Sequence, residues 1–237
     1  HYYGERKFDV ASDLLNTYLE NVKRKTTVQY KEALQLKQQI EKYKEIFNNP
    51  VPFNPVKVNG ASTELDEYLP MLSPDNQYLF YTRKAKMDGK TAMGAEEEEL
   101  FIQSRKQYNG EYSNGIPMPT PFNKGAYQGG SSISIDNRLL FITIVSQSVT
   151  RDGRGYSNGD IYFSERSEGQ WTELKSIGNH LNGRFTWEGQ PSISADNKTL
   201  YFASSRPENI GGAGMDLYKT ERQEDGSWGP AIHLGPR

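Results

Sequence analysis

The sequence contains no cysteine, which excludes disulfide scaffolds, thiolate metal sites and cysteine nucleophiles. No apolar run approaches the roughly 20 residues that a transmembrane helix needs. Charge of one sign is not in excess either, because 28 Lys and Arg residues stand against 30 Asp and Glu residues. A nucleic-acid-binding protein would need a clear cationic surplus. The composition therefore argues against a nucleic-acid partner and against a membrane span within this chain.

Hydrophobic residues are also few, at 35% of the 237 residues, yet aromatic residues make up 12%. Disordered chains are poor in aromatics, so this chain is expected to fold. The 22 glycines and 12 prolines indicate many turns. We expect a core built from short strands that are rich in Tyr, Phe and Trp.

Residues 1–50 have the periodicity of two helices. Apolar residues recur every three or four positions from Phe8 to Val22, and again from Ala33 to Phe47. Thr26 and Gln29 have the spacing of a capping box at the start of the second helix. The pattern predicts a helical hairpin, which is either a structural element or the end of a tetratricopeptide-like helical array.

A repeat of about 60 residues follows from residue 51 onward. A Ser-x-Asp-Asn or Ser-Pro-Asp-Asn turn occurs three times, with its aspartates at Asp75, Asp136 and Asp196. Each turn is followed by an apolar strand, a second apolar strand and a late aromatic residue. Four short antiparallel strands per repeat are typical of a β-propeller blade. We therefore predict a mainly β fold with blades at about 61–123, 124–183 and 184–237, preceded by the helical hairpin.

Three motifs in the third repeat carry a family resemblance, and they span residues 194–202, 205–218 and 225–230. Together they resemble the TolB-type (WD-like) β-propeller repeat, in the version found in cell-envelope proteins of the Bacteroidetes. In that group the propeller often follows tetratricopeptide helices and precedes an OmpA-like peptidoglycan-binding domain, and some members belong to the type IX secretion machinery. The first repeat departs from the pattern, because residues 94–99, which end in the acidic run 96–99, replace the glycine-rich approach to the strand.

This resemblance implies a periplasmic or outer-membrane-associated protein whose partners are other envelope proteins. It also implies a closed ring of six or so blades, because each blade must bury both faces against neighbours. Only three repeats fit in residues 51–237, so we expect this chain to be a piece of a larger ring. If the chain is complete, its flanks are expected to associate with a second copy or another protein.

Catalytic and metal-binding motifs are not evident. The three histidines, His1, His180 and His233, have no metal-ligand spacing, so we predict no catalytic residue, metal or other cofactor. Calcium at residues 96–99 or 152–155 stays open as an alternative. Glu67 and Glu188 precede the first strand of repeats one and three, where Gln128 precedes that of repeat two. This regular placement favours a role in orienting the backbone over acid–base catalysis.

We therefore expect a non-enzymatic envelope scaffold or protein-binding module, and the alternative is a propeller hydrolase that acts on a glycan or peptide. Loops carry function on rigid scaffolds, and the longest ones here are residues 84–98, 146–159 and 205–214. They predict a cationic rim that binds the partner, formed by Arg83, Lys84, Lys86, Arg151, Arg154 and Arg206. The simpler alternative is that Arg83 and Arg206 pair with nearby carboxylates.

Overall fold

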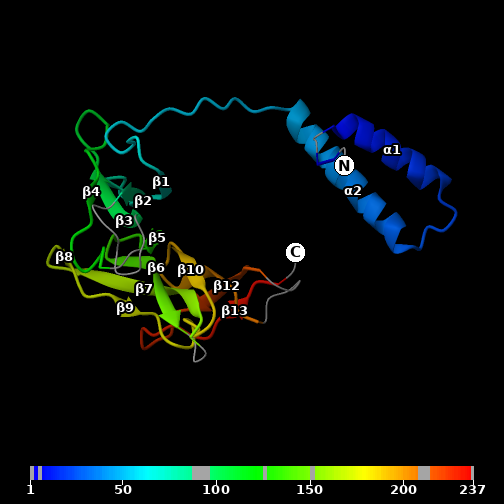
Figure 1. Cartoon of the computed structure of the whole chain (residues 1–237). Helices are drawn as coiled ribbons and strands as arrows, with labels where there is room; N and C mark the ends of the chain where they lie inside the picture. Colours follow the sequence, from blue (N-terminus) through cyan, green and yellow to red (C-terminus); the bar gives the residue numbers. More distant parts are fainter. Residues whose placement is uncertain are drawn as a thin grey trace. The chain divides into compact units, whose positions relative to one another are not determined.

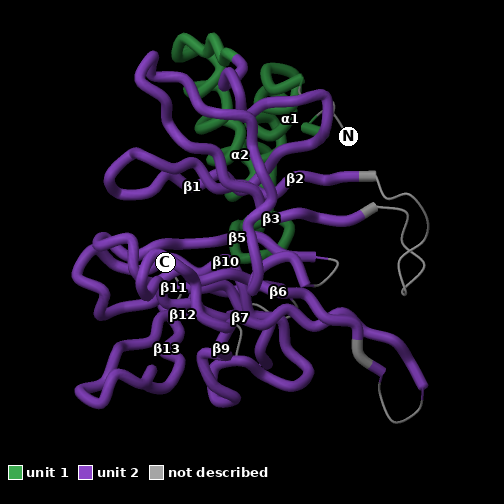
Figure 2. Tube along the Cα trace, turned by 90° about the vertical axis from the view of Figure 1, so that its left-hand side faces the viewer, with its two compact units in different colours: residues 1–56 green, residues 57–237 purple. Residues whose placement is uncertain are grey.

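The computed structural model divides the chain into two compact units, His1–Val56 and Lys57–Arg237 (Figure 2). It describes residues 3–4, 7–86, 97–124, 127–149, 153–207 and 214–235, without the side chains of residues 86, 97 and 148. The first unit is helical and the second is built from strands (Figure 1).

The helical unit consists of α1 (Phe8–Asn21) and α2 (Val28–Asn48). Ala11, Ala33 and Ile40 are buried in it, as the periodicity predicts. The predicted capping box is wrong by one residue, because Thr27 is the N-cap of α2 and its hydroxyl accepts a hydrogen bond from the Tyr30 N–H (3.2 Å). Among the described residues, no helix has both the length and the apolar character that crossing a membrane requires.

The second unit contains three antiparallel sheets whose strands follow one another in chain order, except that β9 of the middle sheet pairs with β7. The first sheet comprises β1 (Glu67–Leu72), β2 (Tyr78–Lys86), β3 (Glu97–Arg105) and β4 (Ile116–Pro117). The middle sheet comprises β5 (Tyr127–Ile133), β6 (Leu139–Val149), β7 (Gly155–Ser167), β8 (Gln170–Trp171) and β9 (Lys175–Ser176). The third sheet comprises β10 (Glu188–Ile193), β11 (Thr199–Ser204), β12 (Asp216–Glu221) and β13 (Ile232–His233).

The prediction of a six-bladed β-propeller is wrong. The described residues form three separate sheets of four, five and four strands, and these sheets do not close into a ring. The mainly β composition and the two preceding helices agree with the sequence. Ring closure is a long-range arrangement, whereas the repeat encodes only the turns and strands within one unit. A repeated local pattern therefore could not establish it.

Apolar side chains fill the spaces between neighbouring sheets. Phe80 and Phe101 of the first sheet pack with Leu140 and Ile142 of the middle sheet. The opposite face of the middle sheet packs against the third through a second cluster, which includes Phe141, Ile161, Leu200, Phe202 and Tyr218. Strand β6 thus provides side chains to the interfaces with both neighbouring sheets, since successive strand residues point to opposite faces.

The three Asp-Asn turns have one geometry. Asn76, Asn137 and Asn197 all have positive φ, between 56° and 59°, a region that Asn tolerates better than most residues. The serine two residues before each aspartate donates its hydroxyl to that aspartate at 2.5–2.6 Å. The predicted turn-forming role of these aspartates is confirmed.

Candidate functional site

The first strand of every sheet begins with a side chain that accepts a backbone hydrogen bond from the preceding loop. Glu67 accepts from the Thr63 N–H (3.1 Å), Gln128 from the Asn123 N–H (3.0 Å) and Glu188 from the Gly183 N–H (2.7 Å). This confirms the prediction that the position orients the backbone. Because a glutamine performs the task in the middle sheet, the task does not require a charge.

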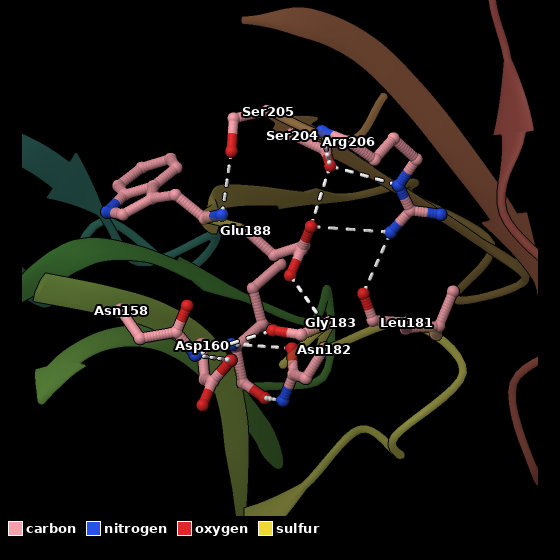
Figure 3. A network of polar contacts seen from close by, with 11 residues as sticks. Asn158, Asp160, Leu181, Asn182, Gly183, Glu188, Ser204, Ser205 and Arg206 are labelled. Atoms are coloured by element: carbon pink, nitrogen blue, oxygen red, sulfur yellow. Dashed lines mark hydrogen bonds and ion pairs between the residues drawn. The ribbon is translucent and has the colours of Figure 1, made fainter. Parts of the chain in front are cut away.

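Two arginines of the predicted binding rim, Arg83 and Arg206, are held inside the unit. Arg83 Nε lies 2.9 Å from Glu67, and Arg206 Nη2 lies 3.5 Å from the fully buried Glu188. Each guanidinium also donates to a loop carbonyl, that of Ala61 (3.0 Å) or Leu181 (2.8 Å). Figure 3 shows Arg206 reaching Glu188, Ser204 and Leu181. Both arginines therefore hold their own loops in place.

The middle sheet lacks this ion pair. Ile144 lies opposite Gln128, whereas Arg83 lies opposite Glu67 and Ser204 opposite Glu188. Two residues beyond Ile144, at the place of Arg206, stands a serine, Ser146. The position thus carries a carboxylate only in the two sheets that also supply an arginine.

The other residues of the predicted rim are dispersed. Lys84 is half-buried in β2, opposite Glu99 in β3, and the backbone of Lys86 ends the same strand. Arg154 is exposed immediately before β7, and Arg151 lies outside the described residues. The β2–β3 and β6–β7 hairpins extend on the same side of the unit in Figure 2. The structure therefore brings the two hairpins to one side of the unit, while Arg83 and Arg206 form ion pairs within their own sheets.

A different feature joins all three sheets, namely a bulge two residues after Glu67, Gln128 and Glu188 in the first strand of each sheet. Leu69, Gly130 and Gln190 have φ values of 52°, 56° and 52° where the strand register shifts. A leucine or glutamine in this left-handed region is strained, and such strain concentrates at functional sites. All three residues line one cavity of about 130 Å³. We take this inner cavity as the candidate functional site.

Trp187 forms an aromatic wall of the inner cavity. Its indole occupies the space that a side chain at Gly159 or Gly189 would fill, since a Cβ at either position would come within 2.3 Å of the ring. The backbone N–H of Trp187 donates to Ser205 Oγ (2.8 Å), and the Trp187 carbonyl accepts from the backbone N–H of Ser205 (3.0 Å). The ring is thus held in place by flanking glycine backbone and by the extended β10–β11 ladder.

Exposed aromatic side chains continue from Trp187 toward the β6–β7 hairpin. Phe185 is 66% exposed, and its ring lies 5.8 Å from that of Tyr156. The Arg184 guanidinium lies 5.1 Å from the Phe185 ring, and the Arg184 carbonyl accepts from the Tyr156 hydroxyl. This aromatic group is not among the residues predicted from the sequence. Its available signal was the run Arg184-Phe185-Thr186-Trp187 immediately before a bulged strand.

One acidic residue, Glu99, lies in the lining of the inner cavity. Glu99 accepts a side-chain hydrogen bond from Tyr68. Burial, and then that hydrogen bond, raise the pKa of Tyr68, so the phenol stays a neutral donor. Nearby in the middle sheet, burial and then the charge of Glu188 raise the pKa of Asp160, against a hydrogen bond from Asn158 (3.1 Å).

The two described histidines have structural hydrogen bonds. His233 Nδ1 accepts from the Gly235 N–H (2.8 Å), so its Nε2 carries the proton and donates to Asp216 (2.9 Å). Both ring nitrogens are engaged, so His233 has a structural role in the third sheet. His180 Nε2 donates to the Trp228 carbonyl (2.8 Å). Within the part of the chain that the structure describes, no three acidic or histidine side chains come together as metal ligands.

No family model and no curated protein matches the sequence. Among solved structures, a puromycin-hydrolysing peptidase of Mycobacterium tuberculosis is similar, with 12% identity and a TM-score of 0.49. The similarity covers 73% of this chain and only 24% of the peptidase. This likeness is too distant to carry an argument about function.

Proposed function

We propose that this protein is a non-enzymatic protein-binding module that accepts a basic side chain of its partner in the inner cavity. The observation that supports this most is the convergence of three strained bulges on a cavity lined by Trp187 and Glu99. An indole face and a carboxylate together recognise a Lys or Arg side chain through cation–π attraction and ion pairing.

The size of the cavity supports a side chain as its occupant. Small-molecule sites usually measure about 300–1,000 Å³, and this cavity has about 130 Å³. The exposed Phe185 beside Trp187 would extend the contact, since aromatic residues are enriched at protein interfaces. The proposal includes a location in the cell envelope, because the third repeat resembles a repeat of cell-envelope proteins.

Selection of peptides from a random display library tests the proposal. We expect the selected peptides to share a Lys or Arg, and Glu99→Gln or Trp187→Ala to weaken their binding about tenfold or more. Tyr108→Ala, which removes a fully exposed ring away from the cavity, serves as the matched control and should leave binding unchanged. Selected peptides without a basic residue, or binding that survives both cavity variants, would refute it.

A hydrolase of glycans or peptides is the second candidate, and one observation favours it. Asp160 has a raised pKa beside the charge of Glu188, as a general acid near a carboxylate would. Glu188 itself is fully buried and bonded to Gly183, Ser204 and Arg206, so it is not placed to attack a substrate. Turnover of glycan or peptide substrates that disappears in Asp160→Asn would establish this candidate over the binding module.

A further inference from the structure

The middle and third sheets enclose a larger cavity, of about 350 Å³, at a distance along the strands from the inner bulges. We call it the second cavity. Its walls are apolar and come from Leu139, Phe141, Phe163, Ile177 and Trp228. Its polar lining comes from Glu165, His180, Arg222 and Ser227. The volume falls at the lower end of the range for small-molecule sites.

The first and middle sheets meet in the same way but leave almost no space. The cavity at the corresponding place has about 20 Å³. The strand register makes the two places comparable, because Tyr78 pairs with Arg105 as Leu139 pairs with Glu165. Trp171 lies opposite Arg166 in the smaller cavity, as Trp228 lies opposite Arg222 in the larger one.

Two aromatic-to-leucine differences distinguish this interface from the first one, and Leu139 is the one of the two that lines the second cavity. Leu139 stands where the first interface has Tyr78. Leu181 stands where the first interface has Phe122, whose ring packs edge-on against Trp171 (5.9 Å). Leu181 and Phe122 occupy equivalent positions, because the residue after each is an asparagine with the same hydrogen bonds. Asn123 bonds the backbone N–H and carbonyl of Phe101, and Asn182 bonds those of Ile161.

The shape of the second cavity is maintained by defined contacts. His180 Nε2 holds the Trp228 carbonyl at 2.8 Å, and the Trp228 ring packs edge-on against Phe141 at 5.8 Å. Phe163 replaces the polar Gln103 of the first interface, which makes the wall more apolar. The mouth carries both an anion, Glu165, and a cation, Arg222, and both residues are exposed.

We propose that the second cavity binds a free α-amino acid with a large apolar side chain. The apolar side chain would occupy the space between Phe141, Phe163 and Trp228. Arg222 would pair with the carboxylate, and Glu165 would pair with the ammonium group. A zwitterionic head on an apolar body is the ligand that matches two opposite charges above an aromatic wall. This proposal is independent of the function proposed for the inner cavity.

Calorimetric titration of the full chain with L-phenylalanine tests the proposal. We expect binding at millimolar or lower concentration, about 1 mM being a realistic dissociation constant for so small a ligand. 3-Phenylpropanoate lacks the ammonium group and phenethylamine lacks the carboxylate, so each should bind about tenfold more weakly. Equal binding of both analogues and phenylalanine would overturn the assigned charges.

The first interface supplies the variants. Leu139→Tyr gives the second cavity the tyrosine of the first interface and should abolish binding, while the near-UV circular dichroism shows whether the fold persists. Arg222→Gln is a surface change that should weaken phenylalanine binding about tenfold and spare phenethylamine. Arg166→Gln, at the matching place of the first interface, should change nothing. No heat with phenylalanine, or undiminished binding in both cavity-directed variants, would overturn the proposal.

Discussion

At the scale of single residues, the unit relies on a few buried polar groups that hold loops against strands. Glu188 is fully buried and receives hydrogen bonds from a loop N–H and from the Ser204 hydroxyl. The side chain of Arg206 is 15% exposed and donates a hydrogen bond to the Leu181 carbonyl, in the loop that precedes β10. A buried pair of this kind is costly to break, because the remaining charge is left without its partner.

Glu188→Gln should therefore lower the free energy of unfolding by about 3 kcal/mol, the lower end for removal of one partner from a buried ion pair. The double change Glu188→Gln with Arg206→Ser reproduces the residues of the middle sheet, Gln128 and Ser146. It should cost less than the single change, since no unpaired charge remains. Urea-induced unfolding of both variants measures this, and a double variant that is less stable than Glu188→Gln would contradict it.

Asp160 provides a pH-dependent prediction of opposite sign to that of an ion-paired carboxylate. Its folded pKa is raised above the unfolded value of 3.8, chiefly by burial. Its contribution to stability is complete below pH 3.8 and is lost as the pH rises through the folded pKa. Asp160→Asn should therefore increase the free energy of unfolding at pH 7, by about 0.5 kcal/mol because solvent reaches the group.

Urea-induced unfolding at pH 7 and near pH 3.5 checks this prediction, and the gain should vanish at the lower pH. Asp136→Asn is the control, because the Ser134 hydroxyl and backbone N–H groups lower the pKa of Asp136. That variant should lose stability at pH 7 and approach the wild type at low pH. An Asp160→Asn variant that is less stable than the wild type at pH 7 would contradict the assigned burial cost.

At the scale of elements, the helix caps and the repeated turns show how far a local pattern reaches. The Ser-x-Asp-Asn signal forms the same turn in all three sheets, because its hydrogen bonds are made within five residues. The start of α2 has two adjacent threonines, and the pattern selected Thr26. The structure caps the helix with Thr27, whose backbone is extended.

Thr27→Ala should consequently destabilise the helical unit by about 1 kcal/mol, since it removes the acceptor for the Tyr30 N–H. Thr26→Ala lacks this effect and serves as the neighbouring control. Thermal unfolding of the helices, followed by the ellipticity at 222 nm, measures the stability of both variants. A larger loss in Thr26→Ala than in Thr27→Ala would restore the predicted capping box.

At the scale of the whole molecule, the strand unit contains its own core. The described members of its three hydrophobic clusters all lie between Ala61 and Ala231. Ala61 is 4% exposed and covers Leu79, Tyr81 and Ile102 on the outer face of the first sheet. Its carbonyl also accepts from Arg83.

A fragment of residues 57–237 should accordingly keep the β-sheet circular dichroism and the unfolding midpoint of the strand unit in the full chain. A second fragment that begins at Glu67 also removes Ala61, and it should unfold at lower denaturant concentration because it exposes the outer face of the first sheet. Urea titration of both fragments provides the comparison. Equal midpoints, or an unfolded longer fragment, would contradict this division of the molecule.

The sequence by itself determined the features whose causes lie within a few residues or within one repeat. These are the two helices, the Asp-Asn turns, the succession of strands, and the backbone-orienting task of Glu67, Gln128 and Glu188. Each depends on side-chain periodicity or on hydrogen bonds to nearby backbone groups.

Only the tertiary structure decided how the sheets are arranged and which side chains meet. Whether sheets close into a ring depends on long-range packing, and the three sheets formed by the described residues do not close. The inner cavity brings Glu99, Gly130, Trp187 and Gln190 together from three sheets. The second cavity lies between the middle and third sheets, where Leu139 takes the place that Tyr78 has between the first two sheets. Such contacts join residues tens of positions apart, and no local pattern specifies them.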